Sequence, residues 1–519
     1  MTDTKMNGAE SLVHTLIANG VEVCFTNPGT SEMHFVAALD HIVGMRSVLA
    51  LQEGVATGAA DGYYRMAGKP ASTLLHLGPG LANGLSNLHN AKKAGSGVVN
   101  IVGEHAASHI ELDAPLTSDI EGIARPVSHW VRTSVSANAV GKDAGEAVQA
   151  AMVAPGQIAT LILPSDTAWN EGGEVQDALP PLAPAPFDAT TLDQAAQALD
   201  GPDTLLLLGG TALTESNLEM AGRIAAKTGC KLLSEWANAR LERGAGRVVI
   251  NRVPYPIDIA LKVLEPYKRI VLLGARAPIG FFAYPGKPAI LTREGANIMT
   301  FADAGADLTG ALIALTDAVG ATDTAPAHIA EANLPERPKG PLDLDKLAQV
   351  IARNIPDDAI VVDESVTTGR AFFPATKGAL KHTWLNNCGG SIGYSIPAAI
   401  GAAIACPDRK VLTLTGDGSA MYTVQGLWTM AREALDVTIL IFANRSYQIL
   451  RGELTNVGVG NPGPRAIDML SLDRPALDWV QMARSMGVDA CRVDSCEALD
   501  AAMDEGLETS GPYLIQVDL

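Results

Sequence analysis

The sequence predicts an α/β fold with three consecutive doubly wound domains, each built on a parallel sheet with helices on both faces. Short apolar strands such as TLLHL, TLLLLGG and KVLTLTG alternate with Ala- and Gly-rich amphipathic segments along most of the 519 residues. That alternation is typical of parallel sheets covered by helices. A chain of this length is too long for one hydrophobic core, and two proline-rich connectors divide it into blocks of similar size.

The connectors set the expected domain boundaries. They span residues 164–186, which contain PPLAPAP, and residues 321–341, which contain LPERPKGPL. Prolines at this density favour extended segments outside a core. We therefore expect an N-terminal domain over 1–170, a central domain over 187–320 and a C-terminal domain over 342–519.

The composition excludes several classes of partner and site. The net charge is −19 and the pI is near 4.9, so nucleic acid or an anionic membrane would be repelled over most of the surface. No apolar stretch is long enough for a convincing membrane span, and the first residues lack the pattern of a signal peptide. The six cysteines are scattered, without zinc-site spacing. We expect a cytoplasmic protein that acts on small molecules.

The strongest motif lies in the third block, in KVLTLTGDGSAMYT and VTILIFANRSYQIL. The first strand is expected to end at a GDG turn over 416–418, with a helix beginning near Ser419, and the second strand to end at Asn444. The carboxyl ends of parallel strands lie at one edge of a sheet, where ligands bind. Asp417 and Asn444 are therefore expected to meet over one site.

The residue types at this edge favour a metal-bound diphosphate. One carboxylate and one amide oxygen suit Mg²⁺, which prefers oxygen ligands in an octahedron completed by water and phosphate. Gly416 and Gly418 would let backbone N–H groups approach the phosphates, and the helix adds the positive end of its dipole. The structural alternative, Asp417 as a simple helix cap, leaves the second strand and Asn444 unexplained.

These motifs resemble the signature of the thiamine diphosphate enzyme family, in which GDG is followed about one helix and one strand later by an Asn pair. Here Ala443 stands in place of the first Asn. The resemblance implies that the side chains of Asp417 and Asn444 and the backbone carbonyl of Ser446 bind Mg²⁺. The cofactor would lie against the same segments, with Gly416, Gly418, Ser419 and Tyr447 as its neighbours.

The first block supplies the residues expected to move protons. Glu53, in LALQEGVATGAADGYYR, matches the family glutamate that contacts the aminopyrimidine of the cofactor and drives deprotonation of its thiazolium carbon. Thr30 and His76, in FTNPGTSEMHF and LLHLGPGLANGLSN, stand where benzoylformate decarboxylase and its relatives have a Ser and a catalytic His. Asn83 would also contact the cofactor.

The third block completes the expected cofactor site. In GGSIGYSIP, the resemblance makes the carbonyl of Gly390 the acceptor for the aminopyrimidine amine. Ile392 would be the apolar wedge that bends the cofactor. The cofactor would be clamped between the first domain of one subunit and the third domain of another, so we expect a homodimer as the minimum unit and a homotetramer as the assembly.

Two departures from the relatives leave the substrate open. Phe281 aligns where benzoylformate decarboxylase has a second His, and Pro115-Leu116 stands where acetolactate synthases carry a Phe-Gln pair. The chain is also short for a flavin-binding acetolactate synthase, so we expect no FAD in the central domain. The substrate pocket is expected to be apolar, lined by Thr30, Leu116, Phe281, Phe282 and Ile449.

The predicted activity is thiamine diphosphate- and Mg²⁺-dependent cleavage or formation of carbon–carbon bonds at a 2-oxo acid, by decarboxylation, by carboligation with an aldehyde, or both. An acetolactate synthase activity is the alternative within the family, and a non-catalytic cofactor binder is a second alternative. A third is an NAD(P)-dependent oxidoreductase, because Gly78, Gly80 and Gly84 follow a strand and Glu104 ends the next one. Elsewhere, Arg240 and Arg243 are expected on a solvated helix face.

Overall fold

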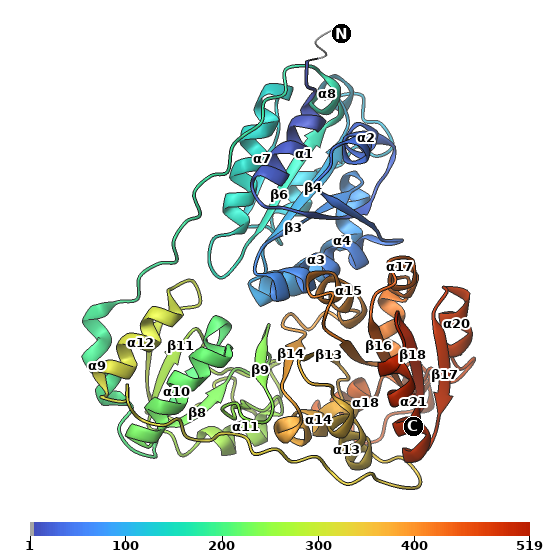
Figure 1. Cartoon of the computed structure of the whole chain (residues 1–519). Helices are drawn as coiled ribbons and strands as arrows, with labels where there is room; N and C mark the ends of the chain where they lie inside the picture. The colour runs from blue at the N-terminus through green and yellow to red at the C-terminus, as the bar shows by residue number, and fades with distance from the viewer. Residues whose placement is uncertain (1–4) are drawn as a thin grey trace.

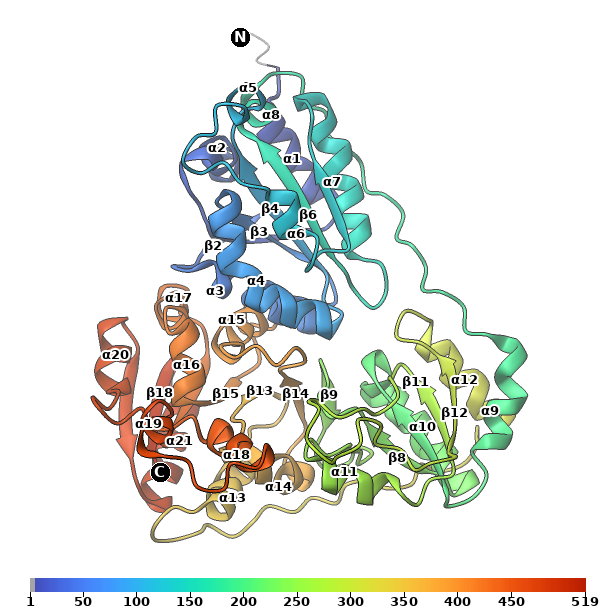
Figure 2. The ribbon, with the colours of Figure 1, turned by 180° about the vertical axis from the view of Figure 1, so that it is seen from behind.

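The computed structural model describes residues 5–519, which form three lobes, each with its own sheet (Figure 1). The predicted α/β fold with parallel sheets is confirmed. Extended segments run along the outside of the molecule from the first lobe to the central lobe and from there to the third (Figure 2). No helix among the described residues is long and apolar enough to cross a bilayer.

The first lobe contains a six-stranded sheet of order β2-β1-β3-β4-β6-β5, with every pair parallel. Its buried strands end at the edge where the candidate catalytic residues lie. The strands are β1 Val23–Asn27, β2 Arg46–Leu49, β3 Ala71–Leu75, β4 Val98–Glu104, β5 Trp130–Thr133 and β6 Ile158–Pro164. The helices are α1 Gly8–Ala18, α2 Met33–His41, α3 Glu53–Ala67, α4 Leu77–Ala94, α5 Ala107–Ile110, α6 Ile120–Ala124, α7 Ala137–Ala151 and α8 Ser165–Trp169, with a 3₁₀ turn η1 at Thr30–Glu32.

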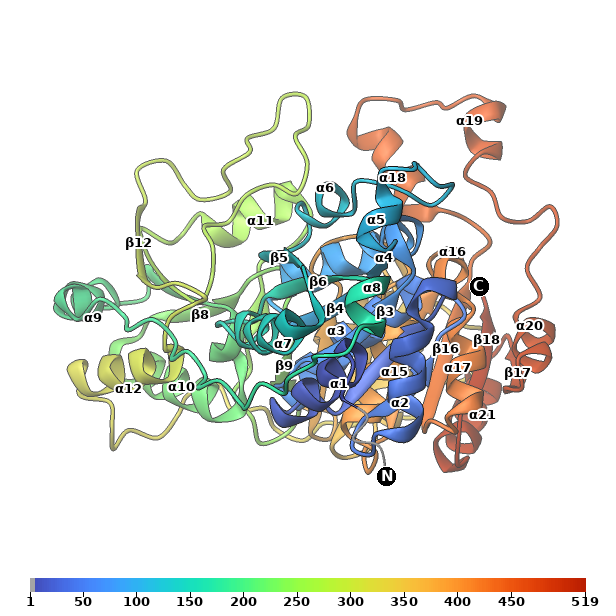
Figure 3. The same cartoon turned by 90° about the horizontal axis from the view of Figure 1, so that it is seen from above.

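The central lobe has a five-stranded sheet of order β10-β8-β7-β11-β12, also parallel throughout. Its strands are β7 Thr204–Leu208, β8 Lys231–Ser234, β10 Asn251–Arg252, β11 Arg269–Leu273 and β12 Asn297–Ala302. The helices are α9 Leu192–Ala198, α10 Glu215–Thr228, α11 Ile257–Leu264 and α12 Leu308–Ala318. The long loop between β11 and β12 and the helices α18 and α19 of the third lobe project on the same side of the molecule (Figure 3).

The third lobe has a seven-stranded sheet of order β17-β18-β16-β15-β13-β14-β9. Its strands in sequence are β13 Ala359–Glu364, β14 His382–Asn386, β15 Val411–Gly416, β16 Val437–Ala443, β17 Asp489–Val493 and β18 Tyr513–Asp518. The helices are α13 Leu344–Asn354, α14 Phe372–Ala375, α15 Ser395–Ala405, α16 Asp417–Ala420, α17 Gly426–Arg432, α18 Gln448–Asn456, α19 Pro464–Asp468, α20 Trp479–Ser485 and α21 Cys496–Glu508. The seventh strand, β9 Leu241–Arg243, comes from the stretch expected to be the central domain and pairs antiparallel with β14.

Helices α3 and α15 join the first lobe to the third, and they lie against each other in Figures 1 and 2. A Cβ atom on Gly62 would lie 2.1 Å from the backbone oxygen of Ala398, and one on Gly401 would lie 1.9 Å from that of Ala59. Contacts this short leave no room for a side chain, so both glycines are required for the two helices to pack backbone to backbone. The small-residue pattern of both helices thus serves the contact between the lobes.

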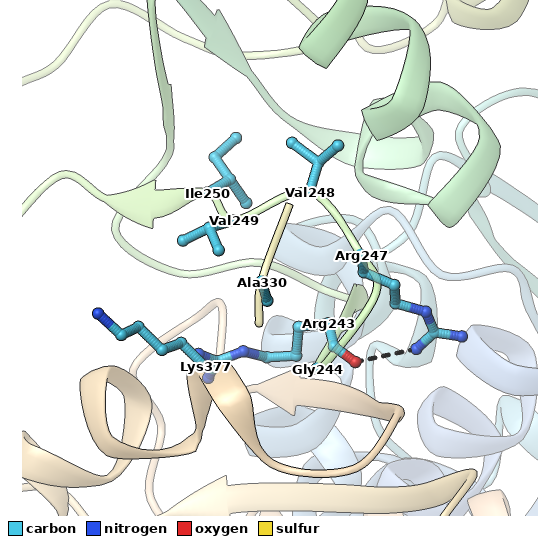
Figure 4. Close-up of a pocket in the computed structure, with 8 residues that line it drawn as sticks. All are labelled: Arg243, Gly244, Arg247, Val248, Val249, Ile250, Ala330 and Lys377. Atoms are coloured by element: carbon cyan, nitrogen blue, oxygen red, sulfur yellow. Dashed lines mark hydrogen bonds between the residues drawn. The ribbon is translucent and has the colours of Figure 1, made fainter. Parts of the chain in front are cut away.

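The expectation that Arg243 lies on a solvated helix face is wrong. Arg243 ends strand β9 and is only 7% exposed, with its guanidinium carbon 3.7 Å from the ring centroid of Phe373. Burial, with a smaller effect from Arg252, lowers the pKa of Arg243 to about 9. Figure 4 shows Arg243, Arg247 and Lys377 around a space of about 10 Å³ at this boundary between lobes.

Acid is expected to destabilise the protein through His382, on the neighbouring strand. Burial, with a smaller effect from Arg243, lowers the pKa of His382 from 6.5 to about 3. Between these values the unfolded chain binds a proton that the folded chain does not, so stability present above pH 6.5 is lost as the pH falls. The loss is at most about 1.4 kcal/mol per pH unit. Calorimetric melting temperatures measured from about pH 7 to pH 5 should fall less steeply for His382→Gln than for wild type. Equal slopes would contradict this, and His14→Gln, at an exposed position, is the control.

Candidate active site

The order of strands in the third sheet brings three loops to one edge. Strand β13 lies between β15 and β14, so the loop over 365–367 lies between the turn at Asp417 and the segment that contains Gly390. In that loop, Val366 has a positive φ of 49°, a conformation costly for a β-branched residue. Sequence reasoning missed this loop, although DESVTTG directly after an apolar strand was a usable signal.

Asp417 is a buried carboxylate at the first residue of α16 and is 3% exposed. Its two oxygens accept the backbone N–H groups of Gly418 at 2.9 Å and Arg445 at 2.8 Å. Burial raises the pKa of Asp417, and these hydrogen bonds oppose the shift. No ion pair neutralises Asp417 within residues 5–519, and the guanidinium of Arg445 pairs instead with Asp518 at 3.3 Å. A bound cation would stabilise this charge.

The turn over 444–446 faces Asp417 and supplies further oxygen atoms. The side-chain oxygen of Asn444 accepts the backbone N–H of Ser446 at 3.0 Å, and Arg445 between them has a positive φ of 53°. Because the Arg445 N–H also donates to Asp417, the structure brings Asp417, Asn444 and Ser446 together. One carboxylate, one amide oxygen and backbone carbonyls form a donor set that fits Mg²⁺.

The glycines of the GDG turn have different surroundings. A Cβ atom on Gly418 would lie 2.6 Å from the ring of Tyr447, so that ring packs directly on the turn. The corresponding position on Gly416 has no atom within 4 Å among the described residues other than Gly416 and its two neighbours in the chain. Space for a phosphate group therefore exists over Gly416, beside the buried Ser419.

Glu53 begins helix α3 in the first lobe and is 8% exposed. The Asn83 amide donates to Glu53 Oε2 at 3.1 Å, and a Cβ atom on Gly80 would lie 3.4 Å from Oε1. The structure thus brings the predicted pair Glu53 and Asn83 together, with small residues of α4 beside the carboxylate. Within residues 5–519 no hydrogen bond or ion pair joins Glu53 to Asp417.

His76 precedes helix α4, and its Nδ1 lies 2.9 Å from Oε2 of Glu32. Thr30 is the exposed first residue of the 3₁₀ turn η1, whose last residue is Glu32. Sequence reasoning singled out Thr30 and His76 but missed Glu32, which is 3% exposed. An acid within a turn of Gly, Thr and Ser was the only signal for it.

The predicted pocket residues fall into two groups. The Phe281 and Phe282 rings pack at 4.7 Å between centroids, and a Cβ atom on Gly390 would lie 2.9 Å from the Phe281 ring. Tyr284, on the same loop, donates its hydroxyl to Glu453 of α18 at 2.7 Å, the helix that also carries Ile449. Leu116 packs separately, against the core shared by the first and third lobes. Ile392 is partly buried beside the Gly390 loop.

Phe281 also lines a cavity of about 540 Å³. The cavity lies at the carboxyl ends of the central strands, between β8 and β11, and its polar lining includes Glu235 and Arg276. Ligands of open α/β sheets bind at such edges. The central cavity and the Gly390 loop are therefore adjacent, with the Phe281 ring at their boundary.

Comparisons with known proteins agree with this geometry. Residues 6–123 match the family described as thiamine pyrophosphate enzyme, N-terminal TPP binding domain, and residues 368–517 match the corresponding C-terminal TPP binding domain. Thiamine pyrophosphate is another name for thiamine diphosphate. The first matched segment contains Glu53, and the second contains Asp417.

Relatives cover nearly the whole chain. A Mycobacterium tuberculosis protein named as a putative acetolactate synthase large subunit is 49% identical over 99% of both chains. Benzoylformate decarboxylase of Pseudomonas aeruginosa is 28% identical over 96% of both chains, and the large subunit of acetolactate synthase isozyme 1 of Escherichia coli is 28% identical over 99% of this chain and 94% of its own. The structure of a thiamine diphosphate-dependent 4-hydroxybenzoylformate decarboxylase of Rhodococcus jostii has the same fold, with a TM-score of 0.85 over 99% of both chains at 24% identity. The chain belongs to the thiamine pyrophosphate enzyme family.

Proposed function

We propose that the protein is a thiamine diphosphate- and Mg²⁺-dependent enzyme that decarboxylates a 2-oxo acid, joins the resulting carbon unit to an aldehyde, or does both. The buried carboxylate of Asp417 at the GDG turn carries the proposal, because it has no ion-pair partner among residues 5–519 and lies in the matched C-terminal TPP binding segment. The relatives named as acetolactate synthases and benzoylformate decarboxylases support the reaction class.

The metal and the diphosphate are assigned to the edge of the third sheet. The side chains of Asp417 and Asn444 and the backbone carbonyl of Ser446 would bind Mg²⁺. The diphosphate would take the free space over Gly416, with Tyr447 beside it. The buried carboxylate of Asp417 favours this assignment, since a divalent cation offsets its desolvation.

Proton transfer is assigned to the first lobe. Bound thiamine diphosphate supplies the electron sink that carbon–carbon bond cleavage next to a carbonyl requires. Glu53 would exchange a proton with the aminopyrimidine while Asn83 orients its carboxylate, and the carbonyl of Gly390 would accept from the amine. Ile392 would press on the cofactor from its apolar side.

The substrate is assigned to the space between the first lobe of one copy and the third lobe of another. Thr30 and His76 would position it and transfer protons, and Leu116, Phe281, Phe282 and Ile449 would exclude water around it. An apolar pocket favours loss of CO₂ because it disfavours the charged carboxylate relative to the more delocalised carbanion. That the central lobe binds no FAD stays a prediction. FAD binding in the cavity of about 540 Å³ would contradict it.

The proposed assembly rests on where the cofactor residues lie, with Glu53 in the first lobe and Asp417 in the third. With Glu53 and Asp417 on different lobes, two copies would complete each other's sites, which supports a homodimer as the active unit and a homotetramer as the full assembly. A cytoplasmic setting is proposed, since the six cysteines are all free and free thiols persist where the environment is reducing.

The structure gives another explanation for the glycines on which the oxidoreductase alternative rested. The glycines that imitate a dinucleotide fingerprint make room for protein atoms, because a Cβ atom on Gly78 would lie 1.9 Å from the Ser118 hydroxyl and one on Gly84 would lie 2.9 Å from Thr57. Both glycines also lie inside helix α4. They are explained by packing, without a pyrophosphate.

The test is CO₂ release from a panel of 2-oxo acids by enzyme dialysed against EDTA, with and without added thiamine diphosphate and Mg²⁺. We expect release only when both are restored, and a hydroxy ketone when an acceptor aldehyde is present. Release that is unaffected by EDTA would refute the metal assignment. No release from any acid would favour a non-catalytic cofactor binder over the proposed enzyme.

A further inference from the structure

We propose that Glu32 is a positioning residue for His76. Its carboxylate accepts the Nδ1–H of the imidazole, which leaves Nε2 as the nitrogen that faces the substrate. The inference rests on the proposed function for the identity of the reaction. The contact between Glu32 and His76, and the alkylation test of it, do not depend on turnover.

Three hydrogen-bond donors surround the buried carboxylate of Glu32. The backbone N–H of Gly29 donates to Oε2 at 2.8 Å, and the hydroxyl of Ser31 donates to Oε1 at 2.8 Å. Nδ1 of His76 lies 2.9 Å from Oε2 and 3.2 Å from Oε1. The side chain of Glu32 is 1% exposed. A carboxylate held in this way has a single orientation and is preorganised to hold the ring.

Two glycines make room for the pair. A Cβ atom on Gly29 would lie 2.1 Å from Nδ1 of His76, and one on Gly103 would lie 1.7 Å from Oε1 of Glu32. Any side chain at either position would displace the imidazole or the carboxylate. Both partners therefore pack against backbone that has no side chain, His76 against the residue before η1 and Glu32 against a residue of strand β4.

The two ring nitrogens of His76 then have different roles. An ionised carboxylate only accepts hydrogen bonds, so the Nδ1 that contacts Glu32 carries a hydrogen and the neutral ring keeps its lone pair on Nε2. Nε2 has no hydrogen-bond partner among the described residues and is not buried, and the side chain is 22% exposed. Nε2 can thus take a proton from the reacting group and return it, with no net change over a cycle.

Alkylation tests the ring geometry without turnover. The full-length enzyme is treated with iodoacetate, and the carboxymethylhistidine isomers are separated from the peptide that contains His76. In wild type we expect Nε2 to be substituted at least tenfold more than Nδ1. Glu32→Ala should lose this preference, and Glu22→Ala, at an exposed position, should retain it. Substitution of wild type mainly at Nδ1 overturns the proposal, even if Glu32→Ala does not fold.

Kinetics provide the second arm. Glu32→Ala is expected to reduce kcat at least tenfold while the KM for thiamine diphosphate changes less than twofold, because Glu32 acts through His76 and not through the cofactor. An equal kcat for Glu32→Ala and wild type would overturn the positioning role. If wild type releases no CO₂ from any 2-oxo acid, the proposed function fails, and the alkylation result still decides whether Glu32 sets the ring.

Discussion

Replacing Glu53 by Gln is expected to lower kcat for CO₂ release by about 100-fold or more, the range for loss of a general acid–base group. Gln has nearly the same shape as Glu and can still accept the amide of Asn83, which donates to Glu53 Oε2 at 3.1 Å. It cannot exchange a proton with the aminopyrimidine. Steady-state assays on the best substrate of the panel, with thiamine diphosphate binding followed by calorimetry, measure the two effects separately.

A matched control separates chemistry from charge. Glu22→Gln removes one carboxylate from the exposed ion pair with Lys69 and should leave kcat within about twofold, because surface pairs contribute little. Unchanged turnover in Glu53→Gln would show that the assigned proton relay is wrong. Loss of cofactor binding in that variant would instead make Glu53 a binding residue.

Replacing Arg65 by Met is expected to destabilise the protein by about 3–5 kcal/mol, as breaking a buried ion pair does. Two nitrogens of Arg65 contact the carboxylate of Asp61 at 2.8 and 2.7 Å, with the side chains 1% and 0% exposed. A third nitrogen donates to the carbonyl of Asn386 at 2.6 Å and to the hydroxyl of Tyr394 at 2.7 Å. Burial lowers the pKa of Arg65, and Asp61 outweighs that effect so that the net shift is upward. Met would leave the Asp61 charge uncompensated.

Urea unfolding monitored by circular dichroism measures the difference. Arg125→Met breaks an exposed pair with Glu121 at the same helical spacing and should cost about 0.5 kcal/mol or less. The double variant Asp61→Asn, Arg65→Met should recover part of the loss, since no buried charge is then left unpaired. An Arg65→Met variant no less stable than Arg125→Met would refute the role assigned to the cluster.

The metal half of the site could be predicted because its signals are local. The GDG turn and the second strand lie within about 30 residues of each other, and the rule that parallel strands end at one edge places Asp417 beside Asn444. In the structure the N–H of Arg445, the residue after Asn444, donates to Asp417. What Asp417 and Asn444 bind stays a prediction, because sequence and geometry establish the donors but not the ion.

Residues whose environment depends on distant segments were missed. Arg243 lies in a three-residue strand that pairs with β14, and a strand this short carries too little periodicity to be distinguished from a helix face. Glu32 is buried because strand β4 has a glycine at 103, and nothing near Glu32 in the sequence indicates that recess. Local patterns predict elements and motifs, while tertiary contacts decide burial.

The backbone contact between α3 and α15 also sets how precisely two parts of the candidate site are placed. Glu53 begins α3, and the loop with Gly390 leads into α15. The amide of Asn87 donates both to the carbonyl of Gly54, at 2.8 Å, and to that of Gly393, at 3.2 Å, so the start of α3 and the loop before α15 are held side by side. A bulkier residue at Gly62 or Gly401 would separate the two helices and so move Glu53 relative to the Gly390 loop, although neither glycine belongs to the candidate site.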